Sequence, residues 1–316
     1  LIENLIEIPI SILGESDGNF ADNDMLFFYG KGPSGFEIVK KDVLWNQNLY
    51  FTESIYWLLI PNDSSLRGKR IQTANKLPID DIILNYGLSH IHKEIDLINP
   101  NESGLAWAEK TIPRGNSVVN EIELSEATSP FNSSGKIGMI GNEKNPTPFQ
   151  NTKHNIQYKI NGQSLGQNTW SNIGMNIFSF SIKNELINNG TNEFTITNTS
   201  DNLNSEPLFD YIDFSYNKRL NYNFPFNFYS PIFDSKVTFQ IIGKNLTIWN
   251  TTDPLKPVNL PLSSIDDTTL LNSELPANSN QRYSVFKIDD INNFSNIQLI
   301  DDEIDWNSLY DNNNDY

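Results

Sequence analysis

The 316-residue sequence contains no cysteine and only three histidines. The lack of cysteine excludes a thiol nucleophile, a disulfide framework and a Cys-based zinc site within these residues. Lysine and arginine are also scarce, since 22 of them stand against 39 acidic residues and the formal charge is −17. Phosphate binding needs clustered cations, so we expect no nucleic-acid ligand. An acidic surface instead keeps a chain soluble and can recruit calcium.

Long apolar runs are missing as well. No stretch approaches the roughly 18 consecutive apolar residues that a membrane-spanning helix needs, so we expect no membrane-spanning segment. The sequence begins Leu1-Ile2-Glu3, without an initiator methionine, a basic segment or the apolar core of a signal peptide. We therefore expect a processed or trimmed piece whose true N-terminus lies elsewhere.

What the sequence does contain is a series of short alternating segments. Apolar residues recur at every second position in 156–160, 178–182, 194–196 and 209–216, and another such segment runs from Ser117 to Leu124. Asn161-Gly162 follows the first of these segments and is the dipeptide favoured where both residues of a hairpin turn need positive φ. With no long helical period between the segments, we predict an all-β fold: an antiparallel β-sandwich or jelly-roll domain flanked by further β-rich segments.

We divide the chain on this basis into four parts. They are an N-terminal β domain (1–112), a jelly-roll-like sandwich (113–220), a β-rich segment that packs on the preceding domains (221–300) and an acidic, Asn-rich linker towards an absent catalytic domain (301–316). We also expect an aromatic strand over 50–60, a hairpin that joins 237–242 to 246–249 across Gly243-Lys244-Asn245, a loop over 263–281 and a last strand at 283–288.

An acidic turn lies between two apolar segments near the N-terminus. Asp17, Asn19, Asp22 and Asp24 place several oxygens on one tight loop, as a hard cation requires, so we name these four residues as a candidate calcium site. The alternative is an Asx-rich turn in which the same side chains accept hydrogen bonds from their own backbone. The spacing does not match an EF-hand, because the first ligand position would fall on Leu13.

A second candidate is His90-Ile91-His92-Lys93-Glu94, because alternate positions on a strand share one face and His-x-His-x-Glu on that face resembles a zinc site. The simpler interpretation, which we prefer, is a solvent-facing strand without metal, since His154 is the only other histidine and no further motif points at this strand.

Taken in order, these landmarks resemble the region that precedes the catalytic domain in gingipain-like cysteine peptidases, especially the sortase of the type IX secretion system. The resemblance covers nearly the whole chain. The stretches that carry it are Asp17-Gly18-Asn19-Phe20 through Asp24, Phe28-Tyr29-Gly30-Lys31-Gly32-Pro33, Tyr50-Phe51, Tyr56-Trp57-Leu58-Leu59, His92-x-Glu94, Ser103-Gly104-x-x-Trp107-x-Glu109, Asn161-Gly162, Asp210-Tyr211-Ile212, Tyr216-Asn217-Lys218-Arg219-Leu220 and Ile248-Trp249-Asn250-Thr251-Thr252-Asp253-Pro254 with Pro257.

The resemblance implies a non-catalytic region of a secreted or surface peptidase. In that family the catalytic His and Cys lie in a caspase-like domain beyond the point that corresponds to Asp315-Tyr316, so no catalytic residue is assigned here. The implied partners are that downstream peptidase domain and an outer-membrane protein, and the implied location is extracellular or at the outer-membrane surface. The alternatives are a carbohydrate- or protein-binding module, in which Trp170 and Trp249 would stack on sugars, and a hydrolase with paired carboxylates, for which the acidic residues show no spacing signal.

Overall fold

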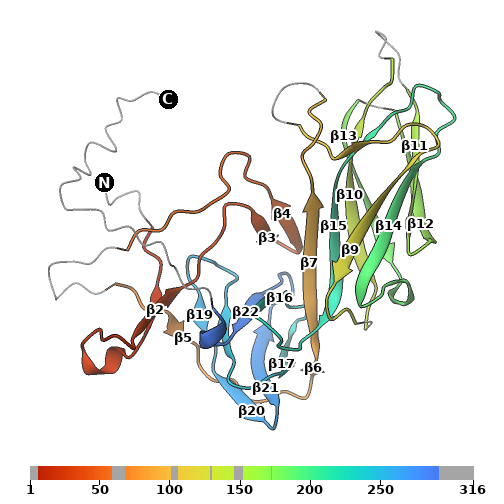
Figure 1. Cartoon of the computed structure of the whole chain (residues 1–316). Coiled ribbons are helices and arrows are strands. Elements are labelled where there is room, and N and C mark those ends of the chain that lie inside the picture. Colours follow the sequence, from red (N-terminus) through yellow and green to blue (C-terminus); the bar gives the residue numbers. More distant parts are fainter. Residues whose placement is uncertain are drawn as a thin grey trace, which may run out of the picture.

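The structure is a computed structural model. It describes residues 6–58, 68–100, 106–128, 130–145, 152–171 and 173–291. The prediction of an all-β fold is confirmed: the chain is built from antiparallel sheets that pack face to face as sandwiches (Figure 1). The described helices are single 3-10 turns, η2 (Glu15–Asp17), η3 (Asn184–Leu186) and η4 (Ile288–Asp290). No helix in the described part of the chain has the length and apolar character needed to cross a membrane.

A large ten-stranded sheet runs through the whole molecule, with its strands in the order β13-β10-β15-β7-β16-β22-β18-β19-β5 and with β8 paired to β15. Most of its pairs are antiparallel, although nearly all neighbours are far apart in the chain, and the short edge pair β19–β5 is parallel. These strands are β5 (Gln72–Thr73), β7 (Tyr86–Glu94), β8 (Lys110–Thr111), β10 (Ser133–Gly141), β13 (Gly174–Ile182), β15 (Leu208–Arg219), β16 (Phe226–Tyr229), β18 (Thr247–Asn250), β19 (Val258–Asn259) and β22 (Arg282–Phe286).

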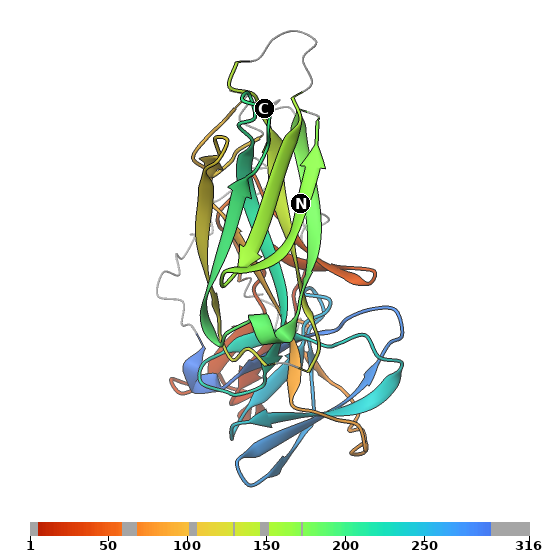
Figure 2. The ribbon, with the colours of Figure 1, turned by 90° about the vertical axis from the view of Figure 1, so that its right-hand side faces the viewer.

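Two smaller sheets cover the large one and make two sandwiches, which lie one above the other in Figure 2. The first smaller sheet has the order β12-β11-β14-β9 and the second β20-β21-β17-β6. The strands are β9 (Ser117–Leu124), β11 (His154–Ile160), β12 (Gln163–Trp170), β14 (Gly190–Asn198), β6 (Ile83–Leu84), β17 (Ser235–Ile242), β20 (Leu262–Ile265) and β21 (Thr268–Leu275).

The N-terminal residues form two separate hairpins. In the first, β1 (Ile10–Leu13) pairs with β2 (Met25–Phe28), and in the second, β3 (Gly35–Val39) pairs with β4 (Asp42–Asn46). Residues 50–58 contain no strand, so the predicted aromatic strand is wrong over its described part. Tyr50 and Phe51 are 81% and 66% exposed, which shows that aromatic content alone does not create a strand when no sheet face is present to cover it.

Each sandwich has its own core. In the first, Phe180, Phe194 and Phe214 lie between the two sheets, where the Phe194 ring centroid is 5.4 Å from that of Phe180 and 5.7 Å from that of Phe214. Strand β9 buries every second residue, as the alternation predicts. In the second, Phe228, Phe239 and Tyr283 meet in the same way. The apolar area buried here supplies the main force for folding.

The Asn161-Gly162 hairpin is confirmed. It joins β11 to β12 with Ile160 opposite Gln163, and both turn residues have positive φ, 47° and 78°. Two other local predictions are wrong. Strands β17 and β18 do not form a hairpin, since β17 pairs with β21 and β6 in one sheet while β18 pairs with β22 and β19 in the other. Residues 263–281 are not a loop, because most of them form the β20–β21 hairpin.

The division into domains stays a prediction. Strand β7, which lies in the predicted N-terminal domain, pairs with β15 along nine residues and also contacts β16, so that it belongs to the sheet of both sandwiches. The predicted linker 301–316 lies outside the described residues.

Candidate functional site

The large sheet has one face that packs in the sandwiches and another, here called the outer face, that is turned away from the two smaller sheets. Polar and aromatic side chains gather on this outer face. The β3–β4 hairpin lies beside β7, and the β1–β2 hairpin lies at the other end of the sheet, near β19 and β5 (Figure 1). Four stacking contacts join them to the sheet: Phe27 with Trp249 (5.7 Å between centroids), Tyr29 with Arg282 (5.3 Å), Phe36 with His90 (5.5 Å) and Trp45 with His92 (4.4 Å). The β3–β4 hairpin therefore shields His90 and His92, which alternate along β7, from water.

His92 is held between two carboxylates. Its Nδ1 lies 2.7 Å from Asp213 Oδ1 and its Nε2 lies 2.8 Å from Glu94 Oε2. Burial lowers the pKa of His92, but the hydrogen bonds to Asp213 and Glu94 outweigh burial and raise it to about 9. His92 is therefore an imidazolium at neutral pH, and with both nitrogens donating it cannot ligate zinc.

His90 has the opposite electrostatic environment. It packs edge-on against Tyr229 at 4.8 Å and against Phe36, and its Nε2 is buried without a hydrogen-bond partner. Burial, together with the positive charge of Lys136, lowers the pKa of His90 to about 4. The preferred interpretation of a solvent-facing strand is therefore wrong for this face of β7, because the β3–β4 hairpin covers both histidines.

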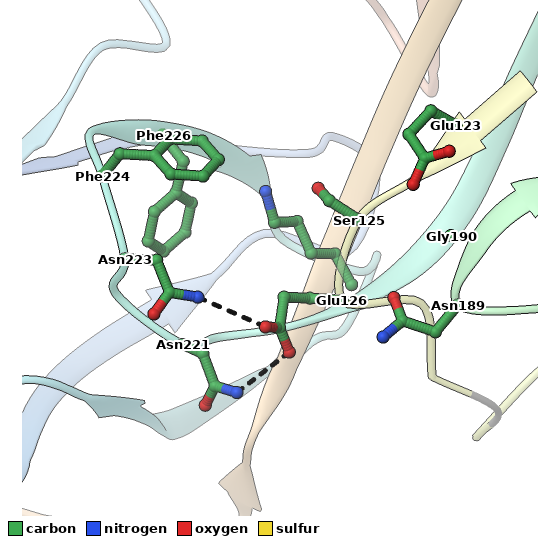
Figure 3. Close-up of a pocket in the computed structure, with 10 residues that line it drawn as sticks. Glu123, Ser125, Glu126, Asn189, Gly190, Asn221, Asn223, Phe224 and Phe226 are labelled. Carbon is green, nitrogen blue, oxygen red and sulfur yellow. Dashed lines mark hydrogen bonds between the residues drawn. The ribbon is translucent and has the colours of Figure 1, made fainter.

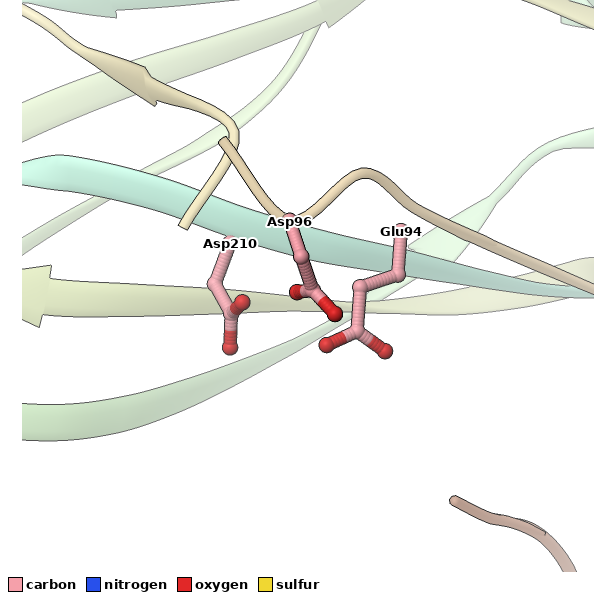
Figure 4. Close-up of side chains that lie close together, drawn as sticks. All are labelled: Glu94, Asp96 and Asp210. Carbon is pink, nitrogen blue, oxygen red and sulfur yellow. The ribbon is translucent and has the colours of Figure 1, made fainter. Parts of the chain in front are cut away.

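A β-bulge gives the same face a group of carboxylates. Ile137 pairs with Ile212 and Met139 with Phe209, so that Asp210 and Tyr211 together stand opposite the single residue Gly138. The bulge allows Phe209 and Ile212 both to reach the core, while Asp210 lies near Glu94 and Asp96 on the outer side (Figure 4). Burial and then the charges of Glu94 and Asp96 raise the pKa of Asp210 to about 7, against the smaller opposing effect of His92.

A cavity of about 270 Å³ lies where the two sandwiches meet (Figure 3). Its carboxylates are already engaged: Glu126 accepts hydrogen bonds from Asn221 Nδ2 at 2.9 Å and Asn223 Nδ2 at 3.4 Å, and Glu123 accepts one from Thr191 Oγ1 at 2.8 Å. Burial lowers the pKa of Lys218, whose ammonium lies 4.9 Å from the Phe226 ring centroid. These contacts join the sandwiches and offer no activated nucleophile among the lining residues.

A second cavity, of about 260 Å³, lies under the N-terminal segment and is lined by Tyr29, Phe36, His90, Tyr229 and Arg282 among others. The Arg282 guanidinium donates to the Thr251 carbonyl oxygen from Nε at 3.0 Å and from the terminal nitrogen at 2.8 Å. That engagement ties the cation to the sheet, so its main role here is to support the stack with Tyr29.

His154 Nδ1 lies 2.9 Å from Ser205 Oγ, a contact that could suggest an activated serine. Both residues are buried, with exposed fractions of 1% and 0%, and Ser205 Oγ also receives a hydrogen bond from Asn198 Nδ2. A substrate cannot reach this hydroxyl, so the pair belongs to a buried polar network that fixes the end of the first sandwich.

The loop of the predicted calcium site forms the connection between β1 and β2. Asp17 Oδ1 accepts a hydrogen bond from the Asn19 backbone N–H at 2.9 Å, and Asp24 Oδ2 accepts one from the Ala21 backbone N–H at 2.7 Å. The three aspartates of this loop are not brought together: among the described residues, only Glu94, Asp96 and Asp210 place three such ligand atoms within 4.8 Å. Calcium at Asp17, Asn19, Asp22 and Asp24 stays a prediction, with the turn interactions as its alternative.

The acidic group on the outer face was not predicted from the sequence. Glu94 and Asp96 lie on consecutive outward positions, and this spacing is visible, but Asp210 is more than a hundred residues away and only the pairing of β7 with β15 brings it close. The sequence offered one signal of this group. Asp210 stands between apolar and aromatic residues, and a carboxylate that is buried in such a segment needs a partner.

A search of protein-family models found no match, and a search of curated proteins found none either. Among solved structures, the chain is similar to dimeric latent PorU from Porphyromonas gingivalis, with a TM-score of 0.65 and 13% identity. The match covers 88% of this chain and 27% of PorU, so the chain spans about a quarter of that protein's length.

Two carbohydrate-binding modules also align with 40% of the chain. One is the CBM36-1 domain of a xylanase from the hindgut metagenome of Trinervitermes trinervoides (TM-score 0.28, 10% identity, 95% of that domain), and the other is CBM36 in complex with calcium and xylotriose (0.26, 13%, 98%). Their TM-scores are too low to support a functional conclusion. The comparisons thus show that this chain shares its β fold with a region of PorU.

Proposed function

We propose that this chain is the non-catalytic β region of a secreted or surface gingipain-like cysteine peptidase and that it supports a caspase-like catalytic domain. The observation that carries this proposal is the similarity of the fold to latent PorU from Porphyromonas gingivalis over 88% of this chain, at a TM-score of 0.65. The ordered motifs of the sequence and the absence of cysteine support it independently. The location would be extracellular or at the outer-membrane surface.

Exposed apolar residues indicate where the catalytic domain would contact this region. Leu49, Tyr50, Phe51 and Ile55 are between 56% and 81% exposed within one short segment. Contiguous exposed apolar residues are typical of interaction sites, because such a patch promotes aggregation when no partner covers it. We propose that the peptidase domain covers this segment and that docking on an outer-membrane protein uses another face.

The direct test is the coding sequence that adjoins this region. We expect an α/β domain that contains a His and a Cys, and an unrelated module in its place would refute the proposal. The joined protein should cleave peptides and lose activity with thiol-blocking reagents, whereas the isolated chain should do neither. Tyr50→Ser with Phe51→Ser should weaken association between the separately produced parts, and Val119→Ser, at an exposed position on β9, is the matched control.

The alternative of a carbohydrate-binding module receives no support from the two tryptophans that suggested it. Trp170 and Trp249 are 8% and 4% exposed; Trp170 packs on His154 and Phe178, and Trp249 lies between Phe27 and Phe286. Aromatic rings that stack on sugars must be accessible, and these two belong to the packed interior.

A further inference from the structure

Three carboxylates meet at the end of β7 on the outer face of the large sheet. Glu94 is the last residue of β7, Asp96 follows it, and Asp210 comes from the bulge of β15. One oxygen from each lies within 4.8 Å of the others, and Figure 4 shows the three carboxyl groups side by side. Three like charges at this separation repel one another unless something neutralises them.

The buried carboxylate of Asp210 lacks a partner that would neutralise its charge. Its side chain is only 4% exposed, and its Oδ1 is buried with no hydrogen-bond donor among the described residues. A buried carboxylate oxygen without a partner carries the full cost of its lost hydration. The Asp210 carboxyl group lies beside those of Asp96 and Glu94 (Figure 4), so one ligand could reach all three side chains.

The nearest cation is already in use. His92 bonds to Asp213 through Nδ1 and to Glu94 through Nε2, and in the described part of the chain no ion pair includes Asp96 or Asp210. On the neighbouring strand, the Glu109 backbone N–H donates to the Phe209 carbonyl oxygen at 2.8 Å, and Glu109 Oε2 is also buried without a partner among the described residues. The protein thus supplies oxygens in excess of positive charge at this point.

We propose that Glu94, Asp96 and Asp210 bind a calcium ion. All three ligands are oxygens, which a hard cation prefers, and the group contains neither a thiolate nor a histidine nitrogen that would favour a transition metal. Oxygens that share a calcium ion at about 2.4 Å are at most about 4.8 Å apart, and one oxygen from each of the three carboxylates meets this limit. Asp96 is exposed, so water can complete the shell.

The bound ion would tie the chain that leaves β7 to the middle of β15. The described residues after Glu94 also pair with Ala108 through Leu97 and Ile98, and Ile98 packs against Ile140 and Leu208. Calcium at this point is therefore a structural clamp on the first sandwich, distinct from the loop at Asp17 and independent of any peptidase activity.

The experiment measures the melting temperature of the whole chain with a chelator and with millimolar calcium chloride. We expect calcium to raise the Tm by a few degrees, because an ion that binds only the native state stabilises it by mass action. Asp96→Asn and Asp210→Asn should each abolish this rise. Asp210→Asn should also melt no lower than the wild type in chelator, because it removes a buried unpaired charge. Asp17→Asn with Asp24→Asn is the matched control and should keep the rise.

Terbium provides a second measurement, since Tyr211 and Trp45 both contact His92 beside the site and can sensitise terbium emission. Calcium should displace the bound terbium, and Asp96→Asn should prevent the emission. The proposal is overturned if calcium leaves the wild-type Tm unchanged, which would mean that a proton neutralises the cluster. It is equally overturned if the rise survives in Asp96→Asn and Asp210→Asn, or disappears only in the control variant.

Discussion

Lowering the pH should destabilise this protein through His90. Its pKa is about 4 in the folded chain against 6.5 for an ordinary histidine, because burial beside Phe36 and Tyr229 disfavours the imidazolium. A group whose folded pKa is depressed binds more protons in the unfolded state, so its contribution to stability is complete above the ordinary pKa and is lost as the pH falls towards the folded pKa.

The size of the effect follows from these two pKa values. Between about pH 7 and about pH 5, linkage predicts that His90 alone lowers the free energy of unfolding by about 2 kcal/mol, and by about 3 kcal/mol once the pH reaches 4. His92 acts in the opposite direction over the same range, because its raised pKa makes its contribution larger at low pH. The raw pH profile therefore mixes the two, and a comparison with a non-titrating variant is needed.

The assay is urea unfolding of the wild type and of His90→Gln at several pH values. We expect the difference in unfolding free energy between the two proteins to shrink by about 2 kcal/mol as the pH falls from about 7 to about 5. Because the chain has only three histidines, NMR of labelled imidazoles can also follow each titration separately. A constant difference between the two proteins, or a His90 resonance that titrates near 6.5, would show that the site is not desolvated as described.

Three further predictions concern stability. Phe194→Ala should cost about 3–5 kcal/mol because it leaves a cavity between two sheets, whereas Val119→Ala on the exposed side of β9 should change little; equal midpoints in urea would contradict the core assignment. Gly162→Val should cost about 1–3 kcal/mol, since φ is 78° there, and Gly162→Asn should cost less; thermal melting of both variants tests this. Gly138→Ala should cost about 1–3 kcal/mol, because a Cβ would lie 2.4 Å from the Tyr211 ring, and a Tm equal to that of the wild type would argue against the bulge.

The sequence by itself determined the strands whose burial alternates. In Ser117–Leu124, exposed and buried residues alternate without exception. Asn and Gly are the residue types that adopt positive φ most readily, and Asn161-Gly162 has positive φ at both positions. Both features are local, because the period of a strand and the conformation of a two-residue turn depend only on neighbouring residues. The all-β class followed from the same local patterns.

Only the tertiary structure decided which strands pair and which side chains meet. Strand β21 buries Thr269, Leu270 and Leu271 in succession and so shows no period of two, and its polar residues suggested a loop. Strands β17 and β18 are close in sequence but enter different sheets, because β17 pairs with β21 and β18 pairs with β22. Asp210 reaches Glu94 through a bulge and a long-range pairing, and such contacts depend on the packing of the whole chain.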